Sequence, residues 1–238
     1  MEMAMSCFRK TVPVSVGMYV PENLVTNDDL SKLINTNDQW IQSRSGIKQR
    51  YHALKGQSTS DLALEACKNA IEKAGLRPKD IDLILAATLS PDYYFPGIGV
   101  QIQNKLGIPN VPAIDIRGQC AGFSWGISTA EAYGKLGLYK NILVVGAETQ
   151  STAVDHSDEG RHIAVLFGDG AGAAIFRSEE CSHEEMPTAK NNVSGITKSR
   201  SWMGSSVGLY TAPWLLKASE PVRIPPILFI IISRTSLA

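Results

Sequence analysis

The alternation of short apolar runs with helical segments is the feature that most constrains the fold of this chain. Continuous apolar runs of strand length lie at residues 81–89, 111–116 and 141–148. A run that is apolar at nearly every position predicts a strand covered on both faces. Because helical segments separate these runs, the sequence predicts an α/β fold with a mostly parallel sheet and helices on both faces.

Local signals place the helices between these strands. Segments 26–34 and 36–46 each open with helix-capping residues, and Gly46 suits a left-handed end for the second helix. Segment 58–75 carries small apolar side chains at helical spacing, which predicts close packing on a sheet and makes Cys67 a packing residue. Further helices are expected at 96–107 and 120–138, the latter buried on most sides, and further strands at 10–20 and 162–176 with a tight glycine turn at 167–172.

Composition excludes several functional classes. The 238 residues contain 23 Lys plus Arg and 23 Asp plus Glu, so the chain lacks the basic footprint of a nucleic-acid binder. Cysteines 7, 67, 120 and 181 form no CxxC pair, which argues against a zinc ribbon or a dithiol site and favours a reducing, cytoplasmic location. No apolar run approaches the roughly 20 residues of a membrane span, and the start does not resemble a secretory signal.

Cys120 is the candidate nucleophile, in the segment "DIRGQCAGFSWG" at residues 115–126. It follows an expected strand and opens an expected helix, whose N-terminal dipole favours an anion such as a thiolate. Gly118 and Gly122 allow a sharp turn and the close approach of a substrate. A free cysteine also packs as a small hydrophobe, so placement by itself leaves both roles open.

The segment "DIRGQCAGFSWGISTAEAYGKLGLYKNILVVGAE" at 115–148 resembles the active-site segment of β-ketoacyl-[acyl carrier protein] synthase III. Segments 36–50, 90–108 and 166–176 resemble the same family in the same order, so the resemblance runs from about Val12 to about Phe176. It implies a thiolase-like fold of two similar α/β halves, of which this chain would hold the first and lack the second. It also favours the nucleophilic role for Cys120.

The resemblance implies an acyltransferase that starts fatty acid synthesis. In the family, the cysteine takes a short acyl group from acetyl-CoA or another acyl-CoA, and the acyl-enzyme condenses with malonyl-[acyl carrier protein] with loss of carbon dioxide. Acyl-CoA is then a substrate, neither a cofactor nor a metal is expected, and a homodimer is implied.

Four further residues match family positions. Trp40 and Arg161 match the residues that hold the adenine of CoA, and Arg44 matches a position near the CoA phosphates. Phe95 matches a residue that reaches the acyl pocket of the partner subunit. Without the family, Trp40 is an anchor of its own helix, Arg161 a solvated loop arginine, and Phe95 a loop aromatic packed on the core.

The resemblance breaks down towards the end of the chain. The family's second half carries a histidine in a Gly-x-His-Gln-Ala-Asn context, a separate asparagine and an oxyanion-hole glycine, and none of these occurs here. His156 is expected on a surface loop, and "CSH" at 181–183 is weak as a metal site. The alternative is therefore a truncated fragment that does not catalyse, or a partial enzyme that accepts an acyl group and cannot condense it. Without a second half, the helix after Cys120 is expected to expose an apolar face. The chain's histidines are His52, His156, His162 and His183.

The expected organisation has four parts. Residues 1–11 form an N-terminal arm, 12–177 the thiolase-like half, 178–213 a loop-rich partial match and 214–238 an atypical, disordered tail. A truncated or frame-shifted gene product, or an alternative transcript, would produce such a tail. Its apolar run at 227–232 has the composition of an aggregation-prone segment.

Overall fold

The computed structural model describes residues 8–182. The expectations for the first seven residues, for His183 and for the tail lie outside the described residues. Among these residues, regular structure runs from Phe8 to Cys181, beyond residues 12 and 177, between which the thiolase-like half was expected.

Within residues 8–182, five strands form the main sheet. Their order is β1–β7–β6–β4–β5, and β4 is parallel to both β5 and β6. Strand β7 is antiparallel to its neighbours β1 and β6, so it is the reversed strand of the mostly parallel sheet that the sequence predicts. The expected α/β architecture is confirmed. The strands are β1 (Phe8–Tyr19), β4 (Leu83–Ala87), β5 (Ala113–Ile116), β6 (Asn141–Thr149) and β7 (Asp169–Cys181).

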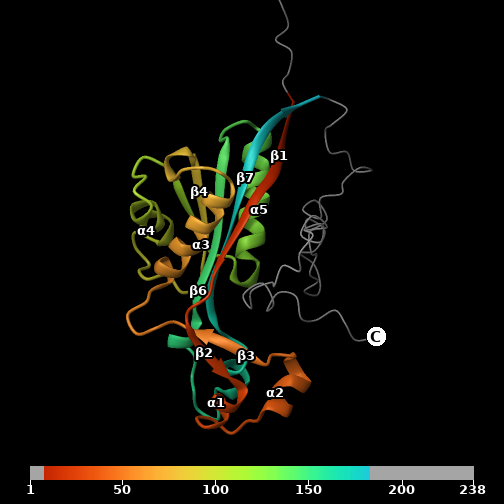
Figure 1. The fold of residues 1–238 in the computed structure, drawn as a ribbon, viewed down its shortest axis with the longest axis vertical. Helices are drawn as coiled ribbons and strands as arrows, with labels where there is room; N and C mark the ends of the chain where they lie inside the picture. The colour runs from red at the N-terminus through yellow and green to blue at the C-terminus, as the bar shows by residue number, and fades with distance from the viewer. Residues whose placement is uncertain (1–7, 183–238) are drawn as a thin grey trace, which may run out of the picture.

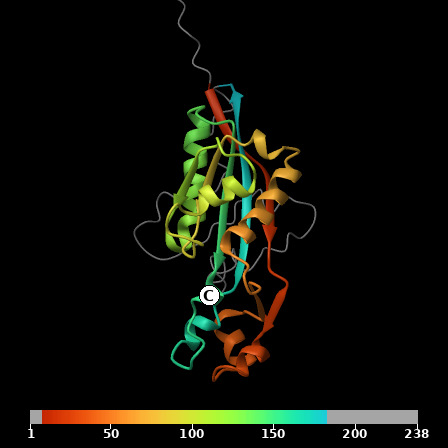
Figure 2. The same ribbon diagram turned by 90° about the vertical axis from the view of Figure 1, so that its left-hand side faces the viewer.

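Helices cover both faces of this sheet (Figure 2). Helices α3 (Thr59–Lys73) and α4 (Ile98–Lys105) pack on one face, and α5 (Gly122–Lys135) packs on the other. The sequence of β4 is apolar throughout because successive side chains point to opposite faces and both faces are covered by helices. Ile84 faces α3, whereas Leu83 faces α5. Both faces of β4 are buried, as its continuous apolar run predicts.

A smaller lobe lies beyond one end of the sheet (Figure 1). Its antiparallel pair β2 (Asn23–Thr26) and β3 (Gln49–His52) joins helices α1 (Asn27–Ser31), α2 (Asp38–Ser45) and α6 (Arg161–Ala164). The expected caps are present, since Thr26 forms a capping box, Asn37 accepts from the Trp40 N–H, and Gly46 ends α2 with φ 71°. The lobe has its own apolar core of Leu30, Ile34, Ile41, Ala164 and Val165.

Helix α5 presents a stripe of small residues to the sheet. Gly122, Gly126, Ala130 and Gly134 are its buried positions, one every four residues. A Cβ on Gly126 would come within 2.8 Å of Val144, so the helix axis lies close to the strands. The outward side is open, with Trp125 44% exposed. Within the described residues the helix is therefore not buried on most sides, and it exposes the apolar face expected when a second half is missing.

Three further expectations need correction. Segment 162–176 is not strand throughout, because Arg161–Ala164 is α6. Segment 167–172 is not a tight turn: β7 begins at Asp169 and carries the glycines along its length. The strand predicted from residues 111–116 is not buried on both faces. Within the described residues β5 is the last strand of the sheet, and Ile114 on it is 38% exposed. Single turns of 3-10 helix lie at η1 (Pro78–Asp80), η2 (Gln119–Ala121) and η3 (Gln150–Thr152).

Candidate active site

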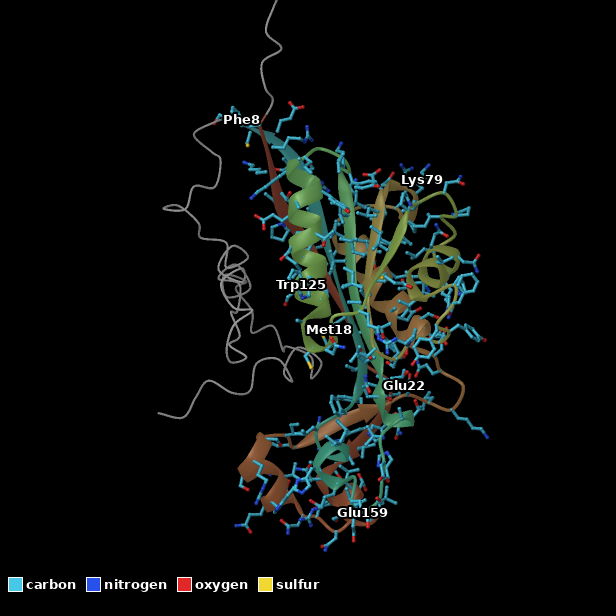
Figure 3. All side chains as sticks on the ribbon, turned by 180° about the vertical axis from the view of Figure 1, so that it is seen from behind. Phe8, Met18, Glu22, Lys79, Trp125 and Glu159 are labelled. Carbon is cyan, nitrogen blue, oxygen red and sulfur yellow. The ribbon has the colours of Figure 1, made fainter. Side chains whose placement is uncertain are left out.

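Cys120 lies at the carboxyl edge of the parallel strands. The last residues of β4 and β5, Ala87 and Ile116, pair with each other, and the chain continues from Ile116 into the turn that contains Cys120. The thiol-bearing residue is exposed. Figure 3 labels Trp125 on the part of α5 nearer the small lobe, so the helix points its N-terminal end towards that lobe. Ligands of open α/β sheets bind at this edge.

The helix after Cys120 begins later than expected. Gln119 has φ 47°, a left-handed conformation that is uncommon for a residue with a side chain. The N–H of Ala121 therefore closes a 3-10 turn onto the carbonyl of Gly118, at 3.0 Å, and α5 proper begins at Gly122. Strain of this kind clusters at functional sites, where it aims a side chain out of the fold.

The N-terminus of α5 suits a negative charge. Its N-cap residue, Ala121, makes no side-chain capping hydrogen bond, and its first turn carries no acidic residue. The first N–H groups of a helix and its dipole stabilise an anion nearby. A thiolate on Cys120, two residues before the first helical residue, would occupy that position.

The other described cysteines differ from Cys120 in their surroundings. Cys67 is fully buried in α3, and this burial raises the pKa of its thiol far above the usual range. It packs among apolar residues, as its helical spacing predicts. Cys181 is half-buried at the end of β7. Cys120 is therefore the exposed thiol of the described segment.

The structure brings three of the predicted binding residues together in the small lobe. The guanidinium carbon of Arg44 lies 4.3 Å from the centre of the Trp40 ring, and that of Arg161 lies 5.2 Å from it. Arg44 belongs to α2 with Trp40, whereas Arg161 arrives from α6, 121 residues later. The ring of His162 lies 5.5 Å from Trp40 on the same short helix as Arg161. Arg161 also donates to the Asn35 carbonyl at 3.1 Å.

The gap between Trp40 and Arg161 is narrower than a bound aromatic ring needs. A ring stacked between two planar groups requires about 3.5 Å on each side, so about 7 Å in all. The observed 5.2 Å means that the Arg161 guanidinium must move outward to admit one. Arg161 is half-buried, and its side chain is long enough to make that movement without a change in α6.

Phe95 lies apart from this cluster, in the segment between β4 and α4. Its side chain is 91% exposed, and the neighbouring Tyr93 and Tyr94 are 65% and 78% exposed. The alternative role of a loop aromatic packed on the core is therefore wrong. Arg117, three residues before Cys120, lies 5.3 Å from the Tyr94 ring and links this segment to the turn of the nucleophile.

Sequence reasoning missed Glu148, which ties down the start of that aromatic segment. Its carboxylate accepts from the N–H groups of Leu89 and Ser90, at 2.8 and 3.1 Å, and from the hydroxyl of Ser90 at 2.5 Å. The signal in the sequence for this role is that Glu148 is a charged residue at the end of an apolar run of strand length.

Asp169 was also missed as a structural anchor. This buried carboxylate accepts from the Ala53 N–H at 2.6 Å, from the Ser151 N–H at 2.8 Å and from the Ser151 hydroxyl. It therefore joins β7 to the end of β3 and to η3, and it fixes the lobe against the sheet. Its position in "FGDGAG" explains that motif as an anchor at the start of a strand.

Residues 8–182 contain neither a cluster of metal ligands nor a membrane-spanning helix. No group of three or more His, Cys, Asp or Glu side chains there could hold a metal ion. Within the same range, no helix combines the length and the apolar character that crossing a membrane requires.

Comparisons with known proteins decide the family. A model described as 3-oxoacyl-[acyl-carrier-protein (ACP)] synthase III matches residues 114–192. A β-ketoacyl-[acyl-carrier-protein] synthase III of Neisseria meningitidis is 49% identical over 165 residues, which are 69% of this chain and 51% of that protein. The protein of the same name from Helicobacter hepaticus is 50% identical over 165 residues, 69% of this chain and 49% of its own. The chain belongs to the β-ketoacyl-[acyl-carrier-protein] synthase III family.

Solved structures of this family share the fold. The 3-oxoacyl-[acyl-carrier-protein] synthase III of Aquifex aeolicus superposes with a TM-score of 0.68 at 41% identity, over 73% of this chain and 54% of that one. The priming β-ketosynthase of the R1128 polyketide pathway gives 0.70 at 31% identity, over 74% and 52%. The thiolase-like fold class is confirmed. The chain spans about half the length of the relatives that it matches.

Proposed function

We propose that this chain carries the acyl-accepting half of a β-ketoacyl-[acyl-carrier-protein] synthase III. The Cys120 thiolate attacks the carbonyl carbon of a short acyl-CoA thioester, the new carbon–sulfur bond forms, and CoA leaves as its thiolate and takes up a proton. Covalent catalysis of this kind divides one acyl transfer into two easier steps. The observation that carries the proposal is the exposed Cys120 at the uncapped N-terminus of α5.

The lobe residues supply the CoA-binding part of the proposal. Trp40 and Arg161 offer two planar faces for the adenine, and the guanidinium of Arg44 is the donor for the CoA phosphates. All three side chains meet at one place in the small lobe, on α2 and α6. Acyl-CoA is thus a substrate, and malonyl-[acyl carrier protein] is the second substrate of the complete reaction.

A homodimer and a cytoplasmic location belong to the same proposal. Strand β5 leaves one edge of the sheet unpaired within the described residues, and Ile114 on it is 38% exposed. The exposed Phe95, which by family resemblance reaches the partner's acyl pocket, adds apolar surface nearby. A paired edge strand would cover both features.

A second candidate is a fragment that does not complete the reaction. It is favoured by the absence of the Gly-x-His-Gln-Ala-Asn motif from the 238 residues. The described histidines lie in the small lobe and its neighbouring loop, where the rings of His52 and His156 lie 6.1 Å apart and that of His162 lies 5.5 Å from Trp40.

Mass spectrometry after incubation with acetyl-CoA tests the nucleophile. We expect one acetyl group on the unmodified chain and none on Cys120→Ser, because Cys120 is the exposed thiol at a helix N-terminus. Cys67→Ala is the matched control. In the unmodified chain the Cys67 thiol is buried and has a raised pKa, so it does not take the acetyl group, and the variant should still be acetylated. Acetylation that persists in Cys120→Ser would contradict the proposal. An unlabelled wild-type chain would favour the fragment.

A further inference from the structure

Arg50 is a buried cation without a carboxylate partner among the described residues. It lies on β3 and is only 2% exposed, which makes it the largest fully buried side chain of that part. Its guanidinium donates to the Asn27 side-chain oxygen at 2.8 Å and to the Val165 carbonyl at 2.9 Å, with a longer contact of 3.5 Å to the Val25 carbonyl. Its Nε has no hydrogen-bond partner in the part of the chain that the structure describes. Burial lowers the pKa of the guanidinium to about 10.

Such a side chain is costly, and packing does not require it. Removing a guanidinium from water is unfavourable, and apolar residues of similar volume usually stabilise a core as well or better. What an apolar residue cannot provide is a rigid planar fork that bonds two separate segments in fixed directions. The role of Arg50 therefore follows from the two segments to which its guanidinium is hydrogen-bonded.

One arm of the fork leads to the helix that carries Trp40. Nη1 donates to Asn27, the first residue of α1, and the Asn27 amide in turn donates to the Asp38 carboxylate at 2.7 Å and to the Ile47 carbonyl at 2.7 Å. Asp38 is the first residue of α2, two residues before Trp40. These bonds, first from Asn27 and then from Gln42, hold the pKa of Asp38 below its usual value and keep it an acceptor.

The other arm leads to the helix that carries Arg161. Nη2 donates to the carbonyl of Val165, which is the C-cap of α6. Helix α6 has only four residues and begins at Arg161, so fixing its last carbonyl fixes the whole turn. One guanidinium is thus linked to both walls of the gap between Trp40 and Arg161, directly to α6 and through Asn27 to α2.

We infer that Arg50 and Asn27 are positioning residues that set the separation of α2 and α6, and with it the width of the gap that a purine ring enters. The helix backbones are held by buried hydrogen bonds, whereas the Arg161 side chain at the surface is the part that moves to admit the ring. The inference rests on the proposed function for the identity of the ligand. The spacing itself is a property of the unliganded chain and is measurable without one.

The test breaks the chain of bonds at Asn27 and then repairs it. Asn27→Asp still accepts from Arg50 and places a carboxylate opposite that of Asp38, so the bond to α2 is lost. In the double variant Asn27→Asp/Asp38→Asn, the amide introduced at position 38 donates back to position 27 and its oxygen accepts from Gln42. Asn69→Asp is the matched control, because Asn69 also donates to a backbone carbonyl, that of Met18, but lies in α3 away from the lobe.

Two readouts separate positioning from general stability. The first is the indole N–H resonance of Trp40 in ¹⁵N-labelled full chain, assigned with Trp40→Phe. The second is the affinity for adenosine 3′,5′-bisphosphate by titration calorimetry, with thermal unfolding as a check on folding. We expect Asn27→Asp to shift the Trp40 resonance and to lose about tenfold in affinity, as for a lost hydrogen bond to a charged group. The double variant should recover both, and Asn69→Asp should change neither.

The outcomes are distinct. A folded Asn27→Asp with the wild-type Trp40 resonance and affinity overturns the inference, and so does a shift that the double variant does not reverse. If the wild-type chain does not bind the bisphosphate, the proposed function fails, while the resonance still decides the positioning role. If Asn27→Asp does not fold, Arg50→Lys decides, because it keeps the charge but loses the planar fork. A Trp40 resonance unchanged in that variant overturns the inference.

Discussion

At the scale of the residue, Trp40 shows how a role depends on neighbours far away in the sequence. On α2 it packs beside the lobe core, which is the role its own helix predicts. Its outward surroundings are Arg44, Arg161 and His162, two of which come from a helix more than a hundred residues later. The ring therefore serves both the core and the surface, and its surface contacts are those that bear on CoA.

Replacing Trp40 tests that second role. We expect Trp40→Ala to weaken CoA binding by about 1–3 kcal/mol, the range for stacking of a base on an aromatic side chain. Trp40→Phe keeps an aromatic face and should retain part of the affinity. Isothermal titration with CoA measures both variants. An unchanged dissociation constant in Trp40→Ala would leave Trp40 with its packing role only.

At the scale of the element, the contact between β1 and α3 depends on a single missing side chain. A Cβ on Gly17 would overlap the backbone oxygen of Ala66 and the backbone nitrogen of Ala70, which cannot turn away as a flexible side chain can. Gly172, on the neighbouring strand β7, pairs with Met18 and has open space where its own Cβ would lie. The two glycines are therefore a matched pair that differs in packing.

We expect Gly17→Ala to lower the free energy of unfolding by about 1–3 kcal/mol or more, as overpacking does. Gly172→Ala should leave it unchanged or raise it by about 0.4–1 kcal/mol, because alanine restricts the unfolded chain. Chemical denaturation of both variants measures the difference. Equal stability would show that α3 shifts freely on the sheet.

The small lobe should weaken in mild acid because of His52 on β3. Burial, the largest cause, lowers the pKa of His52 below its ordinary value of about 6.5, while Asp169 opposes the shift and His156 and Arg50 add to it. The unfolded chain then binds this proton more readily than the folded chain. The contribution of His52 to stability is complete above about pH 6.5 and is lost as the pH falls through the folded pKa.

Thermal unfolding between pH 7.5 and pH 5 measures this effect. The wild-type chain should lose stability over that range, and His52→Gln should lose less, because it removes the titrating group. His162→Gln, an exposed histidine of the same lobe, is the comparison and should follow the wild type. A slope in His52→Gln equal to that of the wild type would contradict the assignment.

At the scale of the whole molecule, the described fold is one half of the architecture of its relatives. Helix α5 covers the sheet with its small residues and leaves Trp125 on its outer side 44% exposed. Half the length of the relatives is unmatched, and the motif that stabilises the enolate in the family is absent from the sequence.

We therefore expect acetylation of Cys120 without condensation. Decarboxylation of malonyl-[acyl carrier protein] creates an enolate, and losing one positioned donor costs about 10²–10³ in rate. Several are missing here, although such losses are not additive. Radiolabelled acetyl-CoA with malonyl-[acyl carrier protein], followed by gel separation, should show no acetoacetyl product from this chain. Turnover equal to that of a full-length relative would refute this, and adding the second half of such a relative is the rescue control.

The sequence by itself determined the elements and the family. Alternating apolar runs predict the strands, and local caps such as Thr26, Asn37 and Gly46 predict the helix ends, because these signals act between residues close in the chain. Ordered motifs around Cys120 predict the thiolase-like fold. These predictions are confirmed. The roles of Cys120, Trp40, Arg44, Arg161 and Phe95 stay predictions.

Tertiary structure decided what depends on distant segments. The edge position of β5 and the open side of α5 follow from the order of the strands, which apolar runs do not encode. The 5.2 Å gap at Trp40 and the links of Arg50 to its two walls, one direct and one through Asn27, arise where segments from opposite ends of the described chain meet. A lone arginine in a short strand is typical of a side chain that points into solvent. Only the three-dimensional packing of β3 against α1 and α6 buries Arg50.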